Sequence, residues 1–408
     1  MGAGMSRFGV FPEKSSRDLF VEAFLEMKET VDLGLDPKKI KALYIGNFNS
    51  ERFENQGQIA PILADWIGLT PRPATRVEDA CASGGVALRQ GIMAIASGFY
   101  DMVLVGGVEK MSGLPIARVT DALEMAADAL YETPSGFTFP GFYAAMATAY
   151  MAEYGMAPEM LWDIAIKDHE NGALNSKAQL QMTIPQAMEK ARSQAASKGW
   201  PEPGWRDEYD FLRDPRTNPM IAYPLRLFDC SPVTDGAAVA LLTSEELARS
   251  FSHQPLYIIG SGQASEGGLY SRDSLLSLQA AKAAAQEAYG QAGIQPLDVK
   301  MAEVHDCFTI AEVIASEDLG FFEPGTGAKA AQDGMTARNG RHPLNTSGGL
   351  KSKGHPVGAT GIGQVVEVWK QMRCEAGSRQ LSQDVNLALT HNVGGTGQTC
   401  AVHIFERR

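Results

Sequence analysis

Hydrophobic positions along the chain follow two patterns: short apolar runs of strand length and alanine-rich stretches of helical length. The runs at 235–242 and 255–259 consist largely of apolar and small residues, as expected of strands that are buried on both faces. The stretch 85–98 has helical length and is rich in alanine. Strands and helices of this kind predict an α/β protein in which helices cover both faces of each sheet.

The same order of segments occurs twice. Residues 2–6 resemble residues 260–264 in their Gly-x-Gly spacing, and residues 40–48 resemble residues 299–308 as a strand that runs into a loop. Self-similarity at this scale is the mark of a duplicated unit. We therefore predict two α/β halves that share one topology.

The duplication also predicts domain bounds. Residues 1–117 together with 221–250 form the N-terminal half, and residues 251–408 form the C-terminal half. Residues 118–220 have no counterpart in the second half, which predicts an inserted loop domain. Its aromatic and Met-rich part, 137–151, is typical either of a substrate-covering segment or of a packed accessory lobe.

Charge and composition exclude several classes of function. The chain has 36 Lys and Arg against 48 Asp and Glu, so its net charge of −12 argues against binding to nucleic acid. No run of about 18 apolar residues predicts a membrane span, and no signal peptide is visible. The five cysteines are scattered and have no zinc spacing. We expect a cytoplasmic protein without a metal site.

The first segment that carries chemistry surrounds Cys81. A strand-like stretch there gives way through small residues to the helix at 85–98. The partial positive charge of a helix N-terminus lowers the pKa of a thiol, which favours the nucleophilic thiolate. A buried core cysteine is the simpler alternative.

Three further segments lie in the second half. The run 303–308 contains His305 and Cys307, and a thiol there can transfer protons in both directions. His355 is the one histidine in a glycine-rich loop at 348–361, where a ligand can approach the backbone closely. A last glycine-rich loop offers backbone donors, from Val393, Gly394 and Gly395.

Together these motifs resemble the thiolases, and in particular the sterol-carrier-protein-type and archaeal-type branch with a His-Asp-Cys-Phe motif. The resemblance rests on Cys81-Ala-Ser-Gly, on His305-Asp-Cys-Phe and on Gly354-His-Pro in that order, and it extends over essentially the whole chain. It implies the thiolase fold, with two βαβαβαββ halves in α-β-α-β-α layers and an inserted loop domain.

The resemblance also implies a mechanism with coenzyme A and acyl-CoA as substrates and with no permanently bound cofactor. Cys81 attacks the thioester to form an acyl-enzyme while His355 assists, and Cys307 removes the α-proton of a second acyl-CoA. His305 and His355 hold the thioester oxygen. The Cys81 amide and one from the 393–395 loop hold the other oxyanion.

The chain departs from the better-known thiolases, which carry a late Cys-x-Gly. Position 391 is His here, so Cys307 takes the place of that thiol, and the role of His391 stays open. Coenzyme A phosphates require a local basic cluster. The candidates are Lys351, Lys353 and Arg226, although lysines beside a glycine loop are commonly only solvated.

Relatives in this family form dimers or tetramers, so the resemblance implies a homo-oligomer. Archaeal relatives also assemble with a hydroxymethylglutaryl-CoA synthase and a small zinc-containing bridging protein. The alternatives to a thiolase are a ketoacyl synthase, a retro-aldolase that acts through a partner, and a noncatalytic acyl-CoA-binding component of a multiprotein complex. Retention of Cys81 argues against the aldolase. Acyl chain length and reaction direction remain open.

Overall fold

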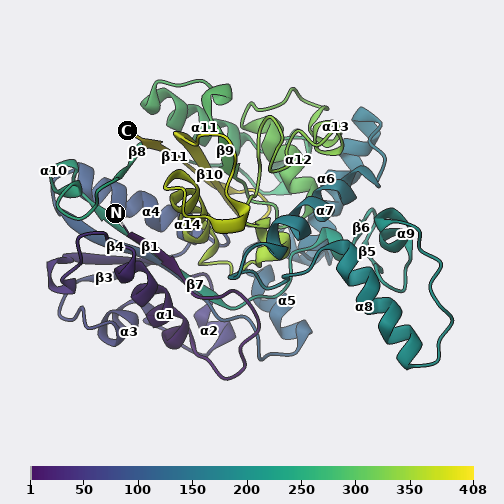
Figure 1. Ribbon diagram of the computed structural model, residues 1–408, viewed down its shortest axis with the longest axis horizontal. Coiled ribbons are helices and arrows are strands. Elements are labelled where there is room, and N and C mark those ends of the chain that lie inside the picture. Colours follow the sequence, from purple (N-terminus) through teal and green to yellow (C-terminus); the bar gives the residue numbers. More distant parts are fainter. Residues whose placement is uncertain (1) are drawn as a thin grey trace.

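The computed structural model describes residues 2–408, and most of its strands form two sheets (Figure 1). Residue 1, which we assigned to the N-terminal half, lies outside the described residues. The first sheet has the order β1-β7-β4-β2-β3, with β1 (Gly2–Met5), β2 (Ala42–Gly46), β3 (Ala74–Val77), β4 (Met102–Glu109) and β7 (Gly236–Thr243). The second has the order β8-β11-β10-β9, with β8 (Leu256–Ser265), β9 (Met301–Glu303), β10 (Leu387–Gly394) and β11 (Thr399–Arg407).

The sheets and helices form five layers. The main helices are α1 (Ser16–Glu29), α3 (Ile59–Trp66), α4 (Ser83–Ala96), α11 (Gln279–Ala292), α12 (Thr309–Asp318) and α14 (Thr360–Met372). On β7, Val239 and Leu241 pack with α1 and α3, whereas Ala238 and Ala240 point the other way and pack with α14. Beyond the second sheet, α11 and α12 share a core with Leu389 of β10. This α-β-α-β-α order confirms the predicted fold.

Two Gly-x-Gly segments set the helices close to the sheets. Gly4 pairs with Val239, and a Cβ atom at Gly4 would lie 2.6 Å from the carbonyl oxygen of Ala23 in α1. Gly262 in β8 makes the same approach to α11, where a Cβ atom would lie 1.9 Å from the Ala284 oxygen. The repeat read from the sequence is therefore a packing requirement that both halves share.

The insert between β4 and β7 contains α5 (Ile116–Glu124), α6 (Phe139–Tyr154), α7 (Met160–Ala173), α8 (Ile184–Ser197), α9 (Glu208–Arg213), β5 (Met220–Ala222) and β6 (Leu225–Arg226). Helix α8 begins at a capping box of Thr183 and Gln186, and α8 and α9 project to the right of the view (Figure 1). Helix α6 instead buries Tyr143 and Tyr150 in the core of the second half. The aromatic part of the insert is thus packed into the body of the protein.

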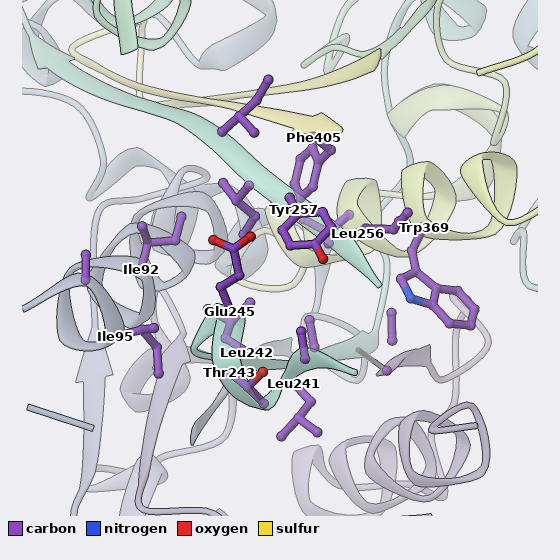
Figure 2. Close-up of a pocket in the computed structure, with 18 of the residues that line it drawn as sticks. Ile92, Ile95, Leu241, Leu242, Thr243, Glu245, Leu256, Tyr257, Trp369 and Phe405 are labelled. Carbon is purple, nitrogen blue, oxygen red and sulfur yellow. The ribbon is translucent and has the colours of Figure 1, made fainter. Parts of the chain in front are cut away.

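An apolar cavity of about 260 Å³ lies where α4, α14, β7 and β8 meet. Ile92, Leu241, Leu256, Trp369 and Phe405 are among the residues that line it (Figure 2). None of the predicted site residues does. Among residues 2–408, the structure contains no helix with both the length and the apolar character that a membrane span requires.

Candidate active site

A tight turn between β3 and α4 presents Cys81. Ala80 has a φ of +49°, a left-handed conformation that is uncommon for a residue with a side chain. The Ser83 hydroxyl holds this turn, because it accepts the backbone N–H of Asp79 at 2.9 Å and donates to the carbonyl of Ala80 at 2.6 Å. Cys81 therefore stands, half-buried, just before the N-terminus of α4.

Two histidines of the second half approach this thiol. The sulfur of Cys81 and one ring nitrogen each of His305 and His355 all lie within 4.8 Å of one another. The two rings meet edge to face, with centroids 5.0 Å apart. The structure thus brings together three residues that are 50 to 274 positions apart in the sequence.

The environment of Cys81 differs from the sequence prediction. Burial raises the pKa of its thiol to about 12, and the charge of Glu109 acts in the same direction. Hydrogen bonds from the backbone N–H groups of Gly395 and of Cys81 itself oppose this shift of the pKa but do not outweigh it. The expected thiolate is therefore a neutral thiol in the resting protein, and its attack on a carbonyl requires a base.

His355 has the protonation state of such a base. Burial, together with the charge of Lys353, lowers the pKa of its imidazole to about 3, so the ring is neutral. Its Nδ1 lies 2.7 Å from the hydroxyl oxygen of Thr360, which donates its own hydrogen to the carbonyl of Pro356. With the hydroxyl hydrogen directed to Pro356, Nδ1–H is the donor in this contact and Nε2 keeps a lone pair that can accept a proton.

His305 differs from His355 in the partner of its Nδ1, which is a side-chain amide rather than a hydroxyl. Burial lowers the pKa of its imidazole well below the usual range, so this ring is neutral as well. Its Nδ1 lies 3.1 Å from the amide nitrogen Nδ2 of Asn392 in β10. The sequence analysis missed Asn392, although it lies in the glycine-rich segment that we singled out, because its partner is 87 residues away.

Cys307 follows β9 and is buried. Burial raises the pKa of its thiol well above the usual range, and the nearby thiol of Cys81 acts in the same direction. The hydroxyl of Tyr143 forms a hydrogen bond with this sulfur, and the ring of Tyr143 packs on Phe308 with centroids 4.7 Å apart. Tyr143 is a second residue that the sequence analysis missed, although its aromatic segment was noted.

The last glycine-rich loop lies against the Cys81 turn. A Cβ atom at Gly394 would lie 2.4 Å from the carbonyl oxygen of Asp79, so only glycine allows this approach. Gly395, with a φ of +61°, directs its N–H to the sulfur of Cys81. Val393 precedes them as part of β10 and pairs with Cys400. The backbone N–H groups of Gly395 and of Cys81 thus both point to the Cys81 sulfur.

Two of the three basic residues predicted to hold coenzyme A phosphates are buried. Lys351 and Lys353 are 2% and 1% exposed. The Lys351 ammonium donates to the carbonyl of Cys230, and that of Lys353 pairs with Glu303 at 3.4 Å. Arg226 is partly exposed and donates to the carbonyl of Asn218 at 2.9 Å. For both lysines this corrects the prediction, because a buried ammonium needs an internal partner and cannot reach a phosphate in solvent.

His391 lies on the face of β10 opposite to Asn392. Its Nδ1 accepts the backbone N–H of His305 at 3.3 Å, and its Nε2 is buried without a hydrogen-bond partner among residues 2–408. Burial lowers the pKa of its ring to about 3. The ring therefore holds the backbone of the residue whose side chain lies beside Cys81.

Within residues 2–408, two clusters have side chains of the types that ligate metals. In the first, Cys81 and His355 offer a sulfur and a free ring nitrogen, but Nδ1 of His305 is already occupied by an amide hydrogen. The second cluster consists of Asp168, Asp306 and Glu312. The ammonium of Lys167 pairs with two of these carboxylates and supplies the positive charge that a cation would bring.

Taken together, the site contains a thiol beside two neutral imidazoles, two backbone N–H groups that point to its sulfur, and a second thiol. These groups suffice for the formation of an acyl-thioester on the protein and for proton transfer at a carbon atom.

Comparisons with known proteins agree with this chemistry. The N-terminal domain model of thiolase matches residues 1–246, and the thiolase C-terminal domain-like model matches residues 262–407. An acetyl-CoA acetyltransferase from Methanothermobacter thermautotrophicus is 43% identical over 100% of this chain and 98% of its own length. Sterol carrier protein 2 from Bos taurus is 29% identical over 97% of this chain and 69% of its length. The solved structure of an Ltp2–ChsH2(DUF35) aldolase, 24% identical, covers 98% of this chain and 96% of that one with a TM-score of 0.79, which shows a shared fold.

Proposed function

The chain belongs to the thiolase family, and from that premise we propose that it transfers acyl groups between coenzyme A thioesters through an acyl-enzyme on Cys81, as an acetyl-CoA C-acetyltransferase or 3-oxoacyl-CoA thiolase. The observation that carries the proposal is the meeting of the Cys81 sulfur with ring nitrogens of His305 and His355 within 4.8 Å. The 43% identity to an acetyl-CoA acetyltransferase supports an acetyl group as the transferred unit.

In the cleavage direction, Nε2 of His355 takes the proton of Cys81 as the sulfur attacks the 3-keto carbon of the substrate. The oxygen of that carbon becomes an oxyanion, which the N–H groups of Cys81 and Gly395 stabilise. Each such donor typically contributes about 3 kcal/mol to lowering the barrier. The bond between C2 and C3 then breaks, and Cys81 retains the acyl group.

The breaking bond leaves its electron pair on C2 of the departing thioester. Cys307, a thiol because burial raises its pKa, gives its proton to that carbon and becomes a thiolate. His305 and His355 hold the thioester oxygen, which carries the enolate charge in the meantime. The first product is thus an acyl-CoA that is shorter by the acyl unit held on Cys81.

Free coenzyme A completes the cycle. Its thiol gives a proton to the Cys307 thiolate, and its sulfur attacks the acyl group on Cys81. The sulfur of Cys81 leaves and recovers the proton held by His355, so each group returns to its starting state. Condensation of two acyl-CoA molecules is the same sequence in reverse, and no permanently bound cofactor is required.

We also propose a homo-oligomer in the reduced environment of the cytoplasm, with roles in lipid metabolism. The five cysteines are all free, as a reduced compartment requires. The fold neighbour named for a DUF35 component supports a partner protein of that kind, here a small zinc-containing bridging protein that connects to hydroxymethylglutaryl-CoA synthase. Co-purification of tagged chain from its native cell, followed by mass spectrometry, tests this assembly.

The test of the activity is incubation with acetoacetyl-CoA and coenzyme A, followed by the loss of the 3-oxo thioester and the gain of acetyl-CoA. We expect turnover by the wild type and by Cys374→Ser, a control at an exposed cysteine, and none by Cys81→Ala. Turnover by Cys81→Ala would overturn the acyl-enzyme. An inert wild type, with short and long 3-oxo thioesters alike, would favour the retro-aldolase or the noncatalytic acyl-CoA-binding component instead.

A further inference from the structure

Asn392 lies in a set of hydrogen bonds that joins the Cys81 turn to His305. Its Oδ1 accepts the backbone N–H of Gly85 at 3.0 Å. Its Nδ2 donates to the carbonyl oxygen of Cys81 at 3.0 Å and lies 3.1 Å from Nδ1 of His305. Because a backbone N–H only donates and a backbone carbonyl only accepts, these two contacts fix which end of the amide is which.

The orientation of the amide decides the state of the histidine. Nδ2 presents only hydrogens, so Nδ1 of His305 must accept one of them and cannot carry a proton of its own. The ring is buried and neutral, and its single proton is therefore on Nε2. His305 can then offer an N–H donor to a ligand, whereas the neighbouring His355 offers a lone pair from its Nε2.

The first half shows that packing alone does not require this pair. Counting the strand register from Gly4 and Gly262 aligns Asn392 with Gly107, and continuing β9 by two residues aligns His305 with Gly46. Both counterparts are glycines, although the sheets share one topology. The amide and the imidazole occur together only in the half that contributes the second thiol.

We infer that Asn392 is a positioning residue that fixes the Nε2–H tautomer of His305, so that this ring donates a hydrogen bond to the thioester oxygen as it gains charge. The choice of ligand rests on the proposed function, whereas the tautomer itself does not. The hydrogen bond from Nδ2 to the Cys81 carbonyl also fixes the position of the Cys81 turn relative to the ring of His305.

The direct test is nuclear magnetic resonance on wild-type protein with ¹⁵N-labelled histidine rings. The His305→Asn variant assigns the His305 signals through their loss. We expect a pyridine-type shift for Nδ1 and a protonated Nε2, with no change between about pH 6 and 9 because the ring pKa lies well below this range. A protonated Nδ1, or a ring that titrates near pH 7, would overturn the inference. No catalytic activity is needed, so this failure differs from failure of the proposed function.

Two substitutions test the consequence for catalysis. Asn392→Asp offers only acceptors to His305 and so favours the Nδ1–H tautomer, whereas Asn392→Ala leaves both tautomers possible. Both variants lose the bond to the Cys81 carbonyl, so they are matched in that respect. We expect cleavage of acetoacetyl-CoA to fall about 10² to 10³-fold in Asn392→Asp, as for loss of an oxyanion donor, and less in Asn392→Ala. Acetylation of Cys81 by acetyl-CoA should change by less than about tenfold in Asn392→Ala.

A different ranking of the activity losses of these two variants would contradict the inference. If Asn392→Ala lost as much activity as Asn392→Asp, or more, Asn392 would act only as a tie between two loops. If the rates of Cys81 acetylation and of carbon–carbon cleavage fell in parallel in Asn392→Ala, the amide would serve the nucleophile rather than His305.

Discussion

The two halves of the molecule share their packing and differ in their chemistry. Each half packs a helix on its first strand through a Gly-x-Gly, and Gly4 and Gly262 meet carbonyl oxygens of α1 and α11 in the same way. Helices α4 and α14 then meet between the sheets, where a Cβ atom at Gly361 would lie 2.3 Å from the backbone nitrogen of Gly85. The shared features are those that bring backbones together.

The differences gather at the carboxyl ends of the strands. By register, His305 and Cys307 of the second half stand where the first half has Gly46 and Phe48. The first half instead carries Cys81 before α4. The second sheet has no strand at the place of β3 among residues 2–408. An isolated bridge between Ala302 and Leu344 lies there instead.

The duplication thus supplied a common frame, and the groups that carry chemistry are divided between its two halves. In the proposed reaction, the first half contributes the nucleophile, and the second half contributes the base, the proton-transferring thiol and the donor from His305. The division can be broken by substitutions that remove one contribution at a time.

The largest effect is expected for Cys81→Ala. Without the nucleophile, turnover of acetoacetyl-CoA should fall by about 10⁴-fold or more, because removal of one member of a nucleophile–base unit disables the whole unit. The thermal midpoint should change little, since the substitution removes a single sulfur atom from a half-buried side chain. Steady-state kinetics and differential scanning calorimetry measure the two quantities, and activity within tenfold of wild type would contradict the assignment.

Cys307→Ala should have the next largest effect, a loss of about 10² to 10⁴-fold in carbon–carbon cleavage, as for removal of a general acid–base group. Exchange of the acetyl group between acetyl-CoA and free coenzyme A should be much less affected, because coenzyme A can leave and attack as a thiolate without proton transfer through Cys307. Rapid-quench kinetics separate the two steps. An equal loss in both would indicate that Cys307 acts in the formation of the acyl-enzyme.

Gly262→Ala and Gly4→Ala test the shared frame. Each added Cβ atom would clash with helix backbone, so we expect each variant to lose about 1 to 3 kcal/mol of unfolding free energy. The control is Gly290→Ala in α11, which meets open space and should stabilise the helix by about 1 kcal/mol. Urea denaturation measures all three. If only one of the first two were destabilising, the two halves would not share this constraint.

The smallest effect concerns pH. Because burial raises the pKa of Cys81 to about 12, its thiolate fraction at lower pH should rise about tenfold for each pH unit. The rate of alkylation of Cys81 by iodoacetamide, followed by peptide mass spectrometry, should therefore climb steadily between about pH 7 and 9. A plateau near neutral pH would instead reveal a thiolate paired with a protonated His355.

Much of this account could be predicted from the sequence, because the repeat and the motifs are local. The Gly-x-Gly pairs predicted the duplicated fold, and the resemblance to the thiolases implied that Cys81, His305 and His355 act together at one site. The bonds of Tyr143 to Cys307 and of Asn392 to His305 could not be predicted, since each joins residues far apart in the chain.

Burial explains the predictions that were wrong. The helix N-terminus beside Cys81 is visible in the sequence, but the desolvation that outweighs it is a property of the folded site. Likewise, the sequence offers Lys353 as a candidate for phosphate binding. Its pairing with Glu303, 50 residues away, is visible only in the folded protein.

The most direct test of the division between the halves is the intact mass of the Cys307→Ala protein after incubation with acetyl-CoA. We predict a mass increase of one acetyl group, located on the peptide that contains Cys81, in a variant that does not cleave acetoacetyl-CoA. Cys307→Ala protein that gains no acetyl group, while the wild type does, would show that the nucleophile cannot work without the second thiol and would contradict the account.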